Sequence, residues 1–420
     1  MRANRVIGLV VVALVGTACA SDGGGQWAGS VTDSAGVEIV SNAGQGMWTA
    51  ADAWTVEEEL KIGTLEGDPD YMFGQVGFLT VDSDGRIYVL DAQAQQIKVY
   101  AADGVYEQTI GRRGGGPGEL RGATFVLMAA GDTLVVPDLN NFRINRYAPD
   151  GASLGSSPID LQAHGVPLVF AGTPSGVLVR QEREFAFPGQ PEIENPQDAI
   201  VTFAADGTVL DTLLTFPAGE TIRLGGSGGP EFNFFSPEPT WAVSADLKLY
   251  YAVNDDYRIG VYNADGELKR VIEMPFERQL VAERDKEALM TFLEQAWTDA
   301  GVPPEAIAQL TSRVSFGEFY PAFASMRAGP EGTIWVQHAQ APSELSDEEY
   351  EAYNPLEDAG GPDWDVFDGA GRYLGVVTLP ARFAPRLILG DKIYGVWRDE
   401  LDVQYVMRMR VVGIREYREG

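Results

Sequence analysis

The sequence has almost none of the residues that form disulfides and histidine-based metal sites. Its 420 residues include one cysteine, Cys19, and two histidines, His164 and His338. A disulfide joins two cysteines, and a zinc site built on three imidazoles needs three histidines, so this chain alone can form neither. We therefore exclude disulfide-stabilised scaffolds and most zinc hydrolases.

Basic residues are also scarce. Lysine and arginine together number 31, against 61 aspartates and glutamates, and the formal net charge is −30. Affinity for a phosphate backbone comes mainly from clustered lysine and arginine, so we do not expect nucleic acid as a partner. With 45% apolar residues, 49 glycines and 24 prolines, the composition favours a large core with many turns. An all-helical bundle is not expected.

The first residues have the pattern of a secretion signal. Two arginines precede an apolar run, from Val6 to Val15, that is too short to span a bilayer. The run leads into Gly16-Thr17-Ala18-Cys19, which resembles the lipobox of bacterial lipoproteins. The resemblance implies that residues 1–18 are a cleaved signal peptide and that Cys19 is lipidated. Ordinary secretion with cleavage near Ala20 is the alternative, and it also places the protein outside the cytoplasm.

The segment after Cys19 is polar and rich in glycine and serine. Residues 19–36 are therefore expected to form a flexible tether. Residues 1–18 contain two arginines and no acidic residue, so their removal leaves 29 basic and 61 acidic residues, a net charge of −32. Ala20 and Ser21 lack the aspartate that retains some lipoproteins in the inner membrane. We expect an acidic domain that is lipid-anchored at the outer membrane or periplasmic face of the cell envelope.

The rest of the chain, residues 37–420, repeats one pattern. An apolar strand, a polar turn, a second strand, a polar loop, a third strand, an Asp-Gly turn and a fourth strand follow one another, most clearly in residues 78–111. Further copies are recognised over residues 125–155, 174–214, 241–274, 329–379 and 386–412. A unit that recurs in this way is typical of a repeat architecture.

The last copy contains only three strands, and the missing strand is found near the start of the domain. Residues 59–63 (ELKIG) resemble residues 108–111 (QTIG), which form the fourth strand of the first clear copy. Four-stranded sheets arranged around an axis form a β-propeller, and strands from both ends of the chain can close the ring. The prediction is all-β: a six-bladed propeller of antiparallel blades, closed by an N-terminal strand, with a small helical insertion.

Two stretches carry a family resemblance. Residues 138–144 (DLNNFRI) and 256–259 (DYRI) resemble the NHL-repeat signature. Residues from about 54 to 412 are similar as a whole to bacterial lipid-anchored six-bladed propellers of that kind. This resemblance implies the fold but not the function, because such proteins range from docking platforms to lactonases and lyases.

Three inserts interrupt the repeat, at about residues 181–199, 276–322 and 338–363. In the second insert, Leu289, Phe292, Leu293, Ala296 and Trp297 recur at helical spacing. Loops between second and third strands share one face of a propeller with the connections between blades. All three inserts are therefore expected on one face, which we call the insert-bearing face and expect to bind the partner. The alternative is that the helices only cover the channel.

Partner-binding candidates come from the inserts and from two glycine-rich connections between blades. Arginines at these connections could hold a carboxylate by bidentate hydrogen bonds, although the glycines also suit a purely structural turn. His338 lies at the end of a second strand, where it could act as a general base or serve only as a hydrogen-bonding residue. Aromatic residues of the inserts could anchor a partner. The candidates are Arg112, Arg113, Arg121, Arg223, His338 and Trp364.

A metal site is the alternative interpretation of the acidic residues. Asp91, Asp138, Asn254 and Asp255 follow second strands, where they could hold one divalent cation in the central channel, as in the lactonase branch of propellers. The competing explanation is that they form hydrogen bonds between neighbouring blades. The first explanation predicts that acids from several blades converge.

The sequence thus favours a cell-envelope lipoprotein with a non-catalytic propeller, which binds a protein or a glycan through the insert-bearing face and needs no cofactor. The alternative is a metal-dependent hydrolase or lactonase that acts at the central channel and uses one divalent cation. The sequence does not decide whether the protein is an enzyme, but it favours a non-catalytic role.

Overall fold

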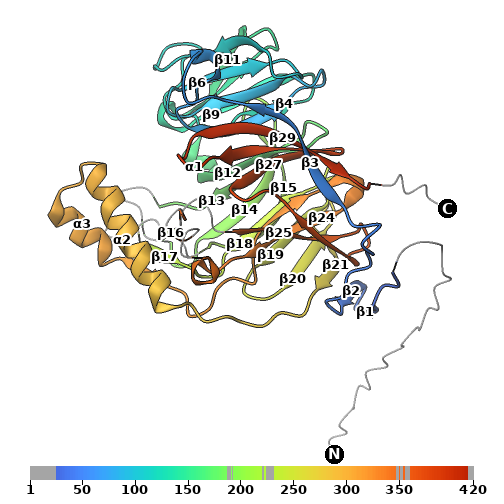
Figure 1. Ribbon diagram of the computed structural model, residues 1–420. Coiled ribbons are helices and arrows are strands. Elements are labelled where there is room, and N and C mark those ends of the chain that lie inside the picture. The colour runs from blue at the N-terminus through green and yellow to red at the C-terminus, as the bar shows by residue number, and fades with distance from the viewer. Residues whose placement is uncertain are drawn as a thin grey trace, which may run out of the picture.

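Six four-stranded antiparallel sheets are arranged around an axis in the computed structural model (Figure 1). The structure describes residues 25–186, 191, 193–219, 222–223, 231–346, 350, 353–354 and 360–414. Within each sheet, strands that follow one another in the chain are hydrogen-bonded neighbours, because tight turns join them. The predicted all-β, six-bladed propeller is confirmed.

The strands of the first three blades follow one another without interruption. Blade 1 comprises β4 (Val76–Val81), β5 (Ile87–Asp91), β6 (Gln96–Tyr100) and β7 (Tyr106–Ile110). Blade 2 comprises β8 (Leu127–Ala129), β9 (Thr133–Asp138), β10 (Arg143–Tyr147) and β11 (Ser153–Pro158). Blade 3 comprises β12 (Val166–Gly172), β13 (Leu178–Arg183), β14 (Gln197–Phe203) and β15 (Val209–Pro217), after the short helix α1 (Leu161–His164).

The other three blades complete the ring. Blade 4 comprises β18 (Pro239–Val243), β19 (Leu249–Val253), β20 (Arg258–Tyr262) and β21 (Leu268–Glu273). Blade 5 comprises β23 (Phe323–Ala328), β24 (Ile334–Ala339), β25 (Gly360–Phe367) and β26 (Tyr373–Thr378). Blade 6 comprises β27 (Phe383–Leu389), β28 (Lys392–Arg398), β29 (Gln404–Val412) and the N-terminal strand β3 (Thr55–Ile62).

Strand β3 closes the ring as predicted. It pairs antiparallel with β29, from Val406 opposite Ile62 to Val412 opposite Thr55. Ile62 is buried in an apolar cluster that joins blade 6 to blade 1. The two ends of the domain therefore share one sheet.

The core of the protein is divided among the junctions between blades. Separate buried clusters join blades 1 and 2, 2 and 3, 3 and 4, 4 and 5, 5 and 6, and 6 and 1. Each blade is sandwiched between two neighbours, so both faces of its middle strands are apolar. Strand β5 shows this most clearly, because all of its residues from Ile87 to Asp91 are buried.

The N-terminal segment differs from the prediction. Its composition predicts a flexible tether up to residue 36, but β1 (Gly29–Ser34) and β2 (Val37–Asn42) form a hairpin on the outer edge of blade 4. Strand β2 runs parallel to β21. Backbone pairing holds β1 although all of its side chains are exposed, which explains why a search for apolar strands missed it.

The second insert contains the predicted helices, α2 (Glu283–Asp299) and α3 (Pro304–Thr311). Leu289 and Leu293 of the predicted apolar stripe are buried, whereas Ala296 is exposed. A small additional sheet contains β16 (Ile222–Arg223), β17 (Glu231–Phe234) and β22 (Val314–Phe316), with β17 and β22 parallel. This sheet links the connection between blades 3 and 4 to the connection between blades 4 and 5. Across the described ranges, no helix is both long enough and apolar enough to span a membrane.

Candidate functional site

The insert-bearing face collects the long connections of blades 3, 4 and 5. Figure 1 shows α2 and α3 beside β16 and β17, on one side of the ring. Phe232 of β17 lies opposite Val314 of β22, so the two blade connections are paired to each other through their backbones. The structure that lies on top of the blades at this face is therefore built from the inserts and long connections, which are the segments that depart from the repeat.

Apolar side chains are exposed on the same face. Seven of the thirteen large hydrophobic residues that are exposed in the described structure lie in loops or strand ends of this face: Leu65, Met72, Phe142, Ile193, Val253, Leu280 and Leu401. Leu280 is 64% exposed and Phe142 is 58% exposed. Phe142 has a φ of 50°, a left-handed conformation that is uncommon for a bulky residue. These side chains are available for contact with a partner.

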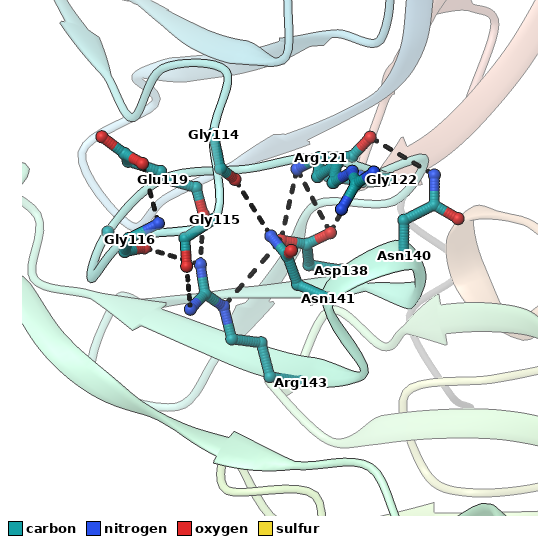
Figure 2. A network of polar contacts seen from close by, with 12 residues as sticks. Gly114, Gly115, Gly116, Glu119, Arg121, Gly122, Asp138, Asn140, Asn141 and Arg143 are labelled. Carbon is teal, nitrogen blue, oxygen red and sulfur yellow. Dashed lines mark hydrogen bonds and ion pairs between the residues drawn. The ribbon is translucent and has the colours of Figure 1, made fainter.

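Asp138, at the end of β9, organises the connection between blades 1 and 2. Its carboxylate is fully buried and accepts hydrogen bonds from the backbone N–H of Gly122 at 2.8 Å and of Arg121 at 3.2 Å (Figure 2). The Asn141 Nδ2 donates to the other oxygen at 2.6 Å. Arg143 Nε lies 3.9 Å from the same oxygen. The carboxylate is therefore surrounded by donors from the connection between blades 1 and 2 and from the segment that follows β9.

Arg143 extends this network into the glycine-rich loop. Its Nη2 donates to the carbonyls of Gly116 and Glu119, both at 2.7 Å (Figure 2). The Glu119 carboxylate accepts the Gly116 N–H at 2.7 Å, and this bond, together with Arg112, lowers the pKa of Glu119 below its ordinary value. Gly118 has a φ of 69°, which favours glycine. The glycine-rich connection is thus a hydrogen-bonded turn, which is the structural role that its glycines suggest.

The predicted arginines lie at two different connections. Arg112 forms an ion pair with Glu119 at 2.7 Å while its side chain stays 80% exposed. The Arg113 Nη2 donates to the carbonyl of Gln93, and the Arg121 side chain is exposed. Arg223 is in β16, on the connection between blades 3 and 4, and its side chain lies outside the described residues. The structure brings the first three together, with Arg143 as a fourth that sequence analysis did not select.

The predicted metal ligands do not converge. Asp91 accepts hydrogen bonds from the N–H groups of Gly74 and Ala94, at 3.0 and 2.8 Å. Asn254 accepts the Glu238 N–H at 2.6 Å and donates to the Phe323 carbonyl at 2.7 Å.

Each of these residues therefore fastens the backbone of its own blade connection, as Asp138 does, while Asp255 is exposed. In the part of the chain that the structure describes, no three histidine, cysteine or acidic side chains are grouped so as to hold a metal ion. Of the three residues, Asn254 reaches a neighbouring blade, as the hydrogen-bonding explanation expects, whereas Asp91 and Asp138 accept hydrogen bonds from their own blade and the connection that enters it.

A cavity of about 390 Å³ lies at the axis, on the side of the ring opposite the inserts. First strands and the turns that follow them line it in blades 1, 2, 3 and 6. Its acidic residues are already engaged: Asp82 forms an ion pair with Arg86 at 2.7 Å, and Asp132 accepts the Ser83 hydroxyl at 2.6 Å. The cavity wall also carries Arg386. With its acidic side chains already paired and an arginine in its wall, the cavity has the character of a polar channel and not of a metal centre.

Positive charge nevertheless lies near the axis. Arg327 of β23 donates from Nη1 to the carbonyl of Met326 at 2.7 Å, and it forms no ion pair with any residue in the described ranges. Burial, followed by the charge of Arg386, lowers the pKa of Arg327 to about 10. The arrangement leaves two guanidinium groups on neighbouring innermost strands of an acidic protein.

His338 lies in a polar cluster between blades 4 and 5. Its Nε2 is 3.0 Å from Oδ1 of the buried Asp365. The hydroxyls of Tyr257 and Tyr373 donate to the same carboxylate at 2.7 and 2.8 Å. Asp365 raises the pKa of His338 above its ordinary value, which increases the protonated fraction at neutral pH. His338 is thus better suited to an ion pair than to the role of general base.

Trp364, predicted to contact a partner, is 1% exposed. It belongs to the apolar cluster between blades 5 and 6, together with Trp335 and Phe383. The tryptophan follows the third insert in sequence but is part of β25, in register with Gln337 of β24. Its position in the sheet directs the ring into the core, so the structure gives it a packing role.

Blade 3 contains a buried polar network that sequence analysis missed. Arg183 forms two hydrogen bonds with Asp198, from Nε at 2.8 Å and from Nη2 at 2.9 Å. Gln181 donates to the same carboxylate at 2.7 Å and accepts the Trp241 Nε1–H of blade 4 at 2.8 Å. Blade 3 is the loosest copy of the repeat, so no aspartate at the usual position signals this site.

Comparisons with known proteins identify the fold. A family described as 6-bladed beta-propeller matches residues 64–162, which contain blades 1 and 2. No curated protein matches the chain in sequence. A solved structure of a DUF4221 family member from Bacteroides vulgatus is similar with a TM-score of 0.51 and 9% identity, over 86% of this chain and 99% of that one.

Two further solved structures cover most of the chain at lower similarity. A Bacteroides fragilis protein described as exported has a TM-score of 0.48 and 11% identity, over 89% of this chain and 99% of that one. A gluconolactonase from Xanthomonas campestris has a TM-score of 0.41 and 11% identity, over 80% of this chain and 88% of that one. At such identities the likeness concerns the fold alone.

Proposed function

We propose that this chain is a lipid-anchored protein of the cell envelope, whose propeller binds a protein partner through the insert-bearing face. The exposed apolar residues of that face support the proposal most directly, because Phe142, Val253 and Leu280 belong to three different connections. Binding surfaces combine apolar and aromatic anchors with polar neighbours, and a patch spread over several loops of a rigid scaffold suits a macromolecule.

The polar surroundings fit this role. Arg112 and Arg121 lie at the same face, on the connection between blades 1 and 2, and their side chains are exposed. In a chain with a net charge of −30, such arginines provide local positive charge beside apolar contacts. A mixed surface of this kind selects partners by charge complementarity as well as by burial.

Catalysis at a metal is supported less well. Asp91 and Asp138, two of the acidic residues expected to form the site, accept backbone N–H groups, and Asp138 already accepts three donors within 3.3 Å. A divalent cation would have to displace these donors at the cost of the connection that they hold. We therefore favour binding over metal-dependent hydrolysis.

Site-specific photo-crosslinking in intact cells tests the proposal. A photoreactive residue replaces Leu280 on the insert-bearing face, and in a separate strain it replaces Leu210 on the outer strand β15. Both leucines are 64% exposed, so the two positions differ in location and not in accessibility. We expect one defined protein adduct from position 280, identified by mass spectrometry, and none from position 210.

The same pair of positions supplies a variant and its control. Leu280→Asp should weaken recovery of the adduct when the photoreactive residue is placed at Val253, because a charge would lie in the apolar contact. Leu210→Asp should leave it unchanged. Equal adducts from positions 280 and 210 would refute a specific surface, and adducts that disappear after glycan hydrolase treatment would assign the face to a glycan instead.

A further inference from the structure

A small aromatic cavity lies beneath helix α2, among the inserts. It has a volume of about 120 Å³. Its walls come from the helix, from the connection between blades 3 and 4, and from the third insert: Phe235, Asp285, Leu289, Phe292, Tyr350 and Tyr353. A cavity of about 150 Å³ holds a benzene-sized molecule, so this one suits the end of a side chain.

Asp285 is the only charged residue that lines this cavity in the described structure. Its side chain belongs to the first turn of α2, and the residue is 1% exposed. The Oδ2 accepts the Tyr320 hydroxyl and, at 3.2 Å, the N–H of Ser343. The Oδ1 is buried and has no hydrogen-bond partner among the described residues. Half of a buried carboxylate is thus left without a donor.

Leaving such an oxygen without a donor is costly. A buried acceptor that loses water without gaining a partner costs about 1–3 kcal/mol, and more when it is charged. The N-terminus of α2 stabilises negative charge on Asp285 in general, but an acid in the first turn obtains this benefit on the helix surface as well. The helix therefore accounts for an acidic residue at this position and not for its burial beneath aromatic rings.

The aromatic walls favour positive charge. The face of a tyrosine or phenylalanine ring attracts a cation, and rings arranged around one point form the cages that bind alkylammonium groups. Tyr350 already shows this contact on one face, where the Arg284 guanidinium lies 3.9 Å from the ring centre. Rings and a carboxylate in one small cavity complement a cation with a short alkyl chain.

We infer that this cavity binds the ammonium group of a lysine side chain from the protein partner, with Asp285 Oδ1 as its acceptor and Phe292, Tyr350 and Tyr353 around its methylene groups. The inference rests on the proposed function, because it supplies a specific contact for the insert-bearing face. A lysine is favoured over an arginine because the compact ammonium fits a narrow cavity better than the planar guanidinium does.

Calorimetric titration of the full-length protein in mild detergent tests the cavity with small probes. We expect saturable binding of n-butylammonium chloride, and weaker binding of n-butylguanidinium. The neutral alcohol 1-butanol has the same alkyl chain and should not bind measurably. Asp285→Asn should weaken n-butylammonium binding about tenfold or more, because the amide keeps the shape of the side chain without its charge.

Glu283→Gln is the matched control. Glu283 is in the same helical turn and carries the same charge, but its side chain is 75% exposed and pairs with Lys286 instead of lining the cavity. This variant should bind n-butylammonium as the unaltered protein does. If Asp285→Asn does not fold, as judged by circular dichroism, Phe292→Leu provides a second test, because it keeps the buried helix face apolar while removing a ring.

The outcomes separate this inference from the proposed function. Equal binding of 1-butanol and n-butylammonium, or unchanged binding by Asp285→Asn, would show an apolar cavity without cation selectivity and overturn the inference. The partner adduct at position 280 would then still stand. Conversely, cation-selective binding by a protein that gives no adduct would overturn the partner while the cavity remains an ammonium site.

Discussion

At the scale of single residues, a side chain at the end of the second strand holds the incoming connection in blades 1, 2 and 4. Asp91 and Asp138 accept backbone N–H groups from the segment that enters the first strand of their own blade. Asn254 does the same and also donates to blade 5 through the carbonyl of Phe323. The role needs an acceptor near exposed backbone donors, which explains the acidic pattern without a metal.

We predict that Asp138→Asn lowers the free energy of unfolding by about 2–3 kcal/mol, because the amide places a donor among the donors of Gly122, Asn141 and Arg143. Urea unfolding followed by tryptophan fluorescence measures the change. Asp150→Asn is the control, since Asp150 is exposed and, among the described residues, accepts only the N–H of Ala152 in a turn. Its cost should stay within about 0.5 kcal/mol. An equal loss of unfolding free energy in both variants would contradict the role of Asp138 in holding the connection between blades 1 and 2.

At the scale of elements, the N-terminal segment contributes two different structures. Strand β3 completes blade 6, whereas the hairpin β1–β2 extends the outer edge of blade 4. Asn42 docks the hairpin, because its Nδ2 donates to the carbonyls of Glu273 and Gly371, both at 3.1 Å, and its Oδ1 accepts the N–H of Tyr373 at 2.8 Å. One side chain thereby joins blades 4 and 5.

Two truncations distinguish these roles. A chain that begins at Gly44 loses the hairpin but keeps β3, so we expect it to fold with a modest loss of stability. A chain that begins at Thr64 also loses β3 and exposes the buried edge of β29, which should cost about 5 kcal/mol or more. Thermal unfolding followed by circular dichroism compares them. Similar midpoints for the two truncations would show that closure by β3 contributes little.

The same elements show what the sequence can and does not reveal. The blades are predictable because strands between two neighbours are apolar on both faces, as β5 is, and because Asp-Gly turns recur at fixed places. β1 is not predictable by that criterion, since backbone pairing alone holds its exposed residues. Asp285 is equally hidden, because its burial follows from the packing of three distant connections that leave no local pattern.

Site prediction fails for a related reason. Trp364 and Phe142 are both large aromatic residues near loops, yet Trp364 is 1% exposed and Phe142 is 58% exposed. Register decides between them: Trp364 lies opposite Gln337 in a sheet, while Phe142 ends the short turn after β9. A single sequence shows which residues could anchor a partner, but the position of each in the sheet or turn determines which are available.

At the scale of the whole molecule, the two faces of the ring differ. The insert-bearing face combines exposed apolar residues with the aromatic cavity at Asp285, whereas the central cavity on the other side carries Arg386 and acids that are already engaged. The net charge of −30 repels anionic surfaces. An anchor at the N-terminus would hold such a molecule at a membrane that it does not otherwise attract, leaving the insert-bearing face free for its partner.

The anchor itself gives the last prediction. In a bacterial host, the unaltered chain should be cleaved before Cys19 and partition into the detergent phase of Triton X-114, because acyl chains contribute about 0.8 kcal/mol per buried methylene. Cys19→Ser should remove the lipid and move the protein to the aqueous phase, while Ser21→Ala, a change beside the cleavage site that spares the thiol, should leave partitioning unaltered. Intact mass spectrometry identifies the N-terminus and the lipid in each case. An unaltered chain found in the aqueous phase, with an N-terminus near Ala20 and no added lipid mass, would replace the anchored protein with a secreted one and leave the binding face to act in solution.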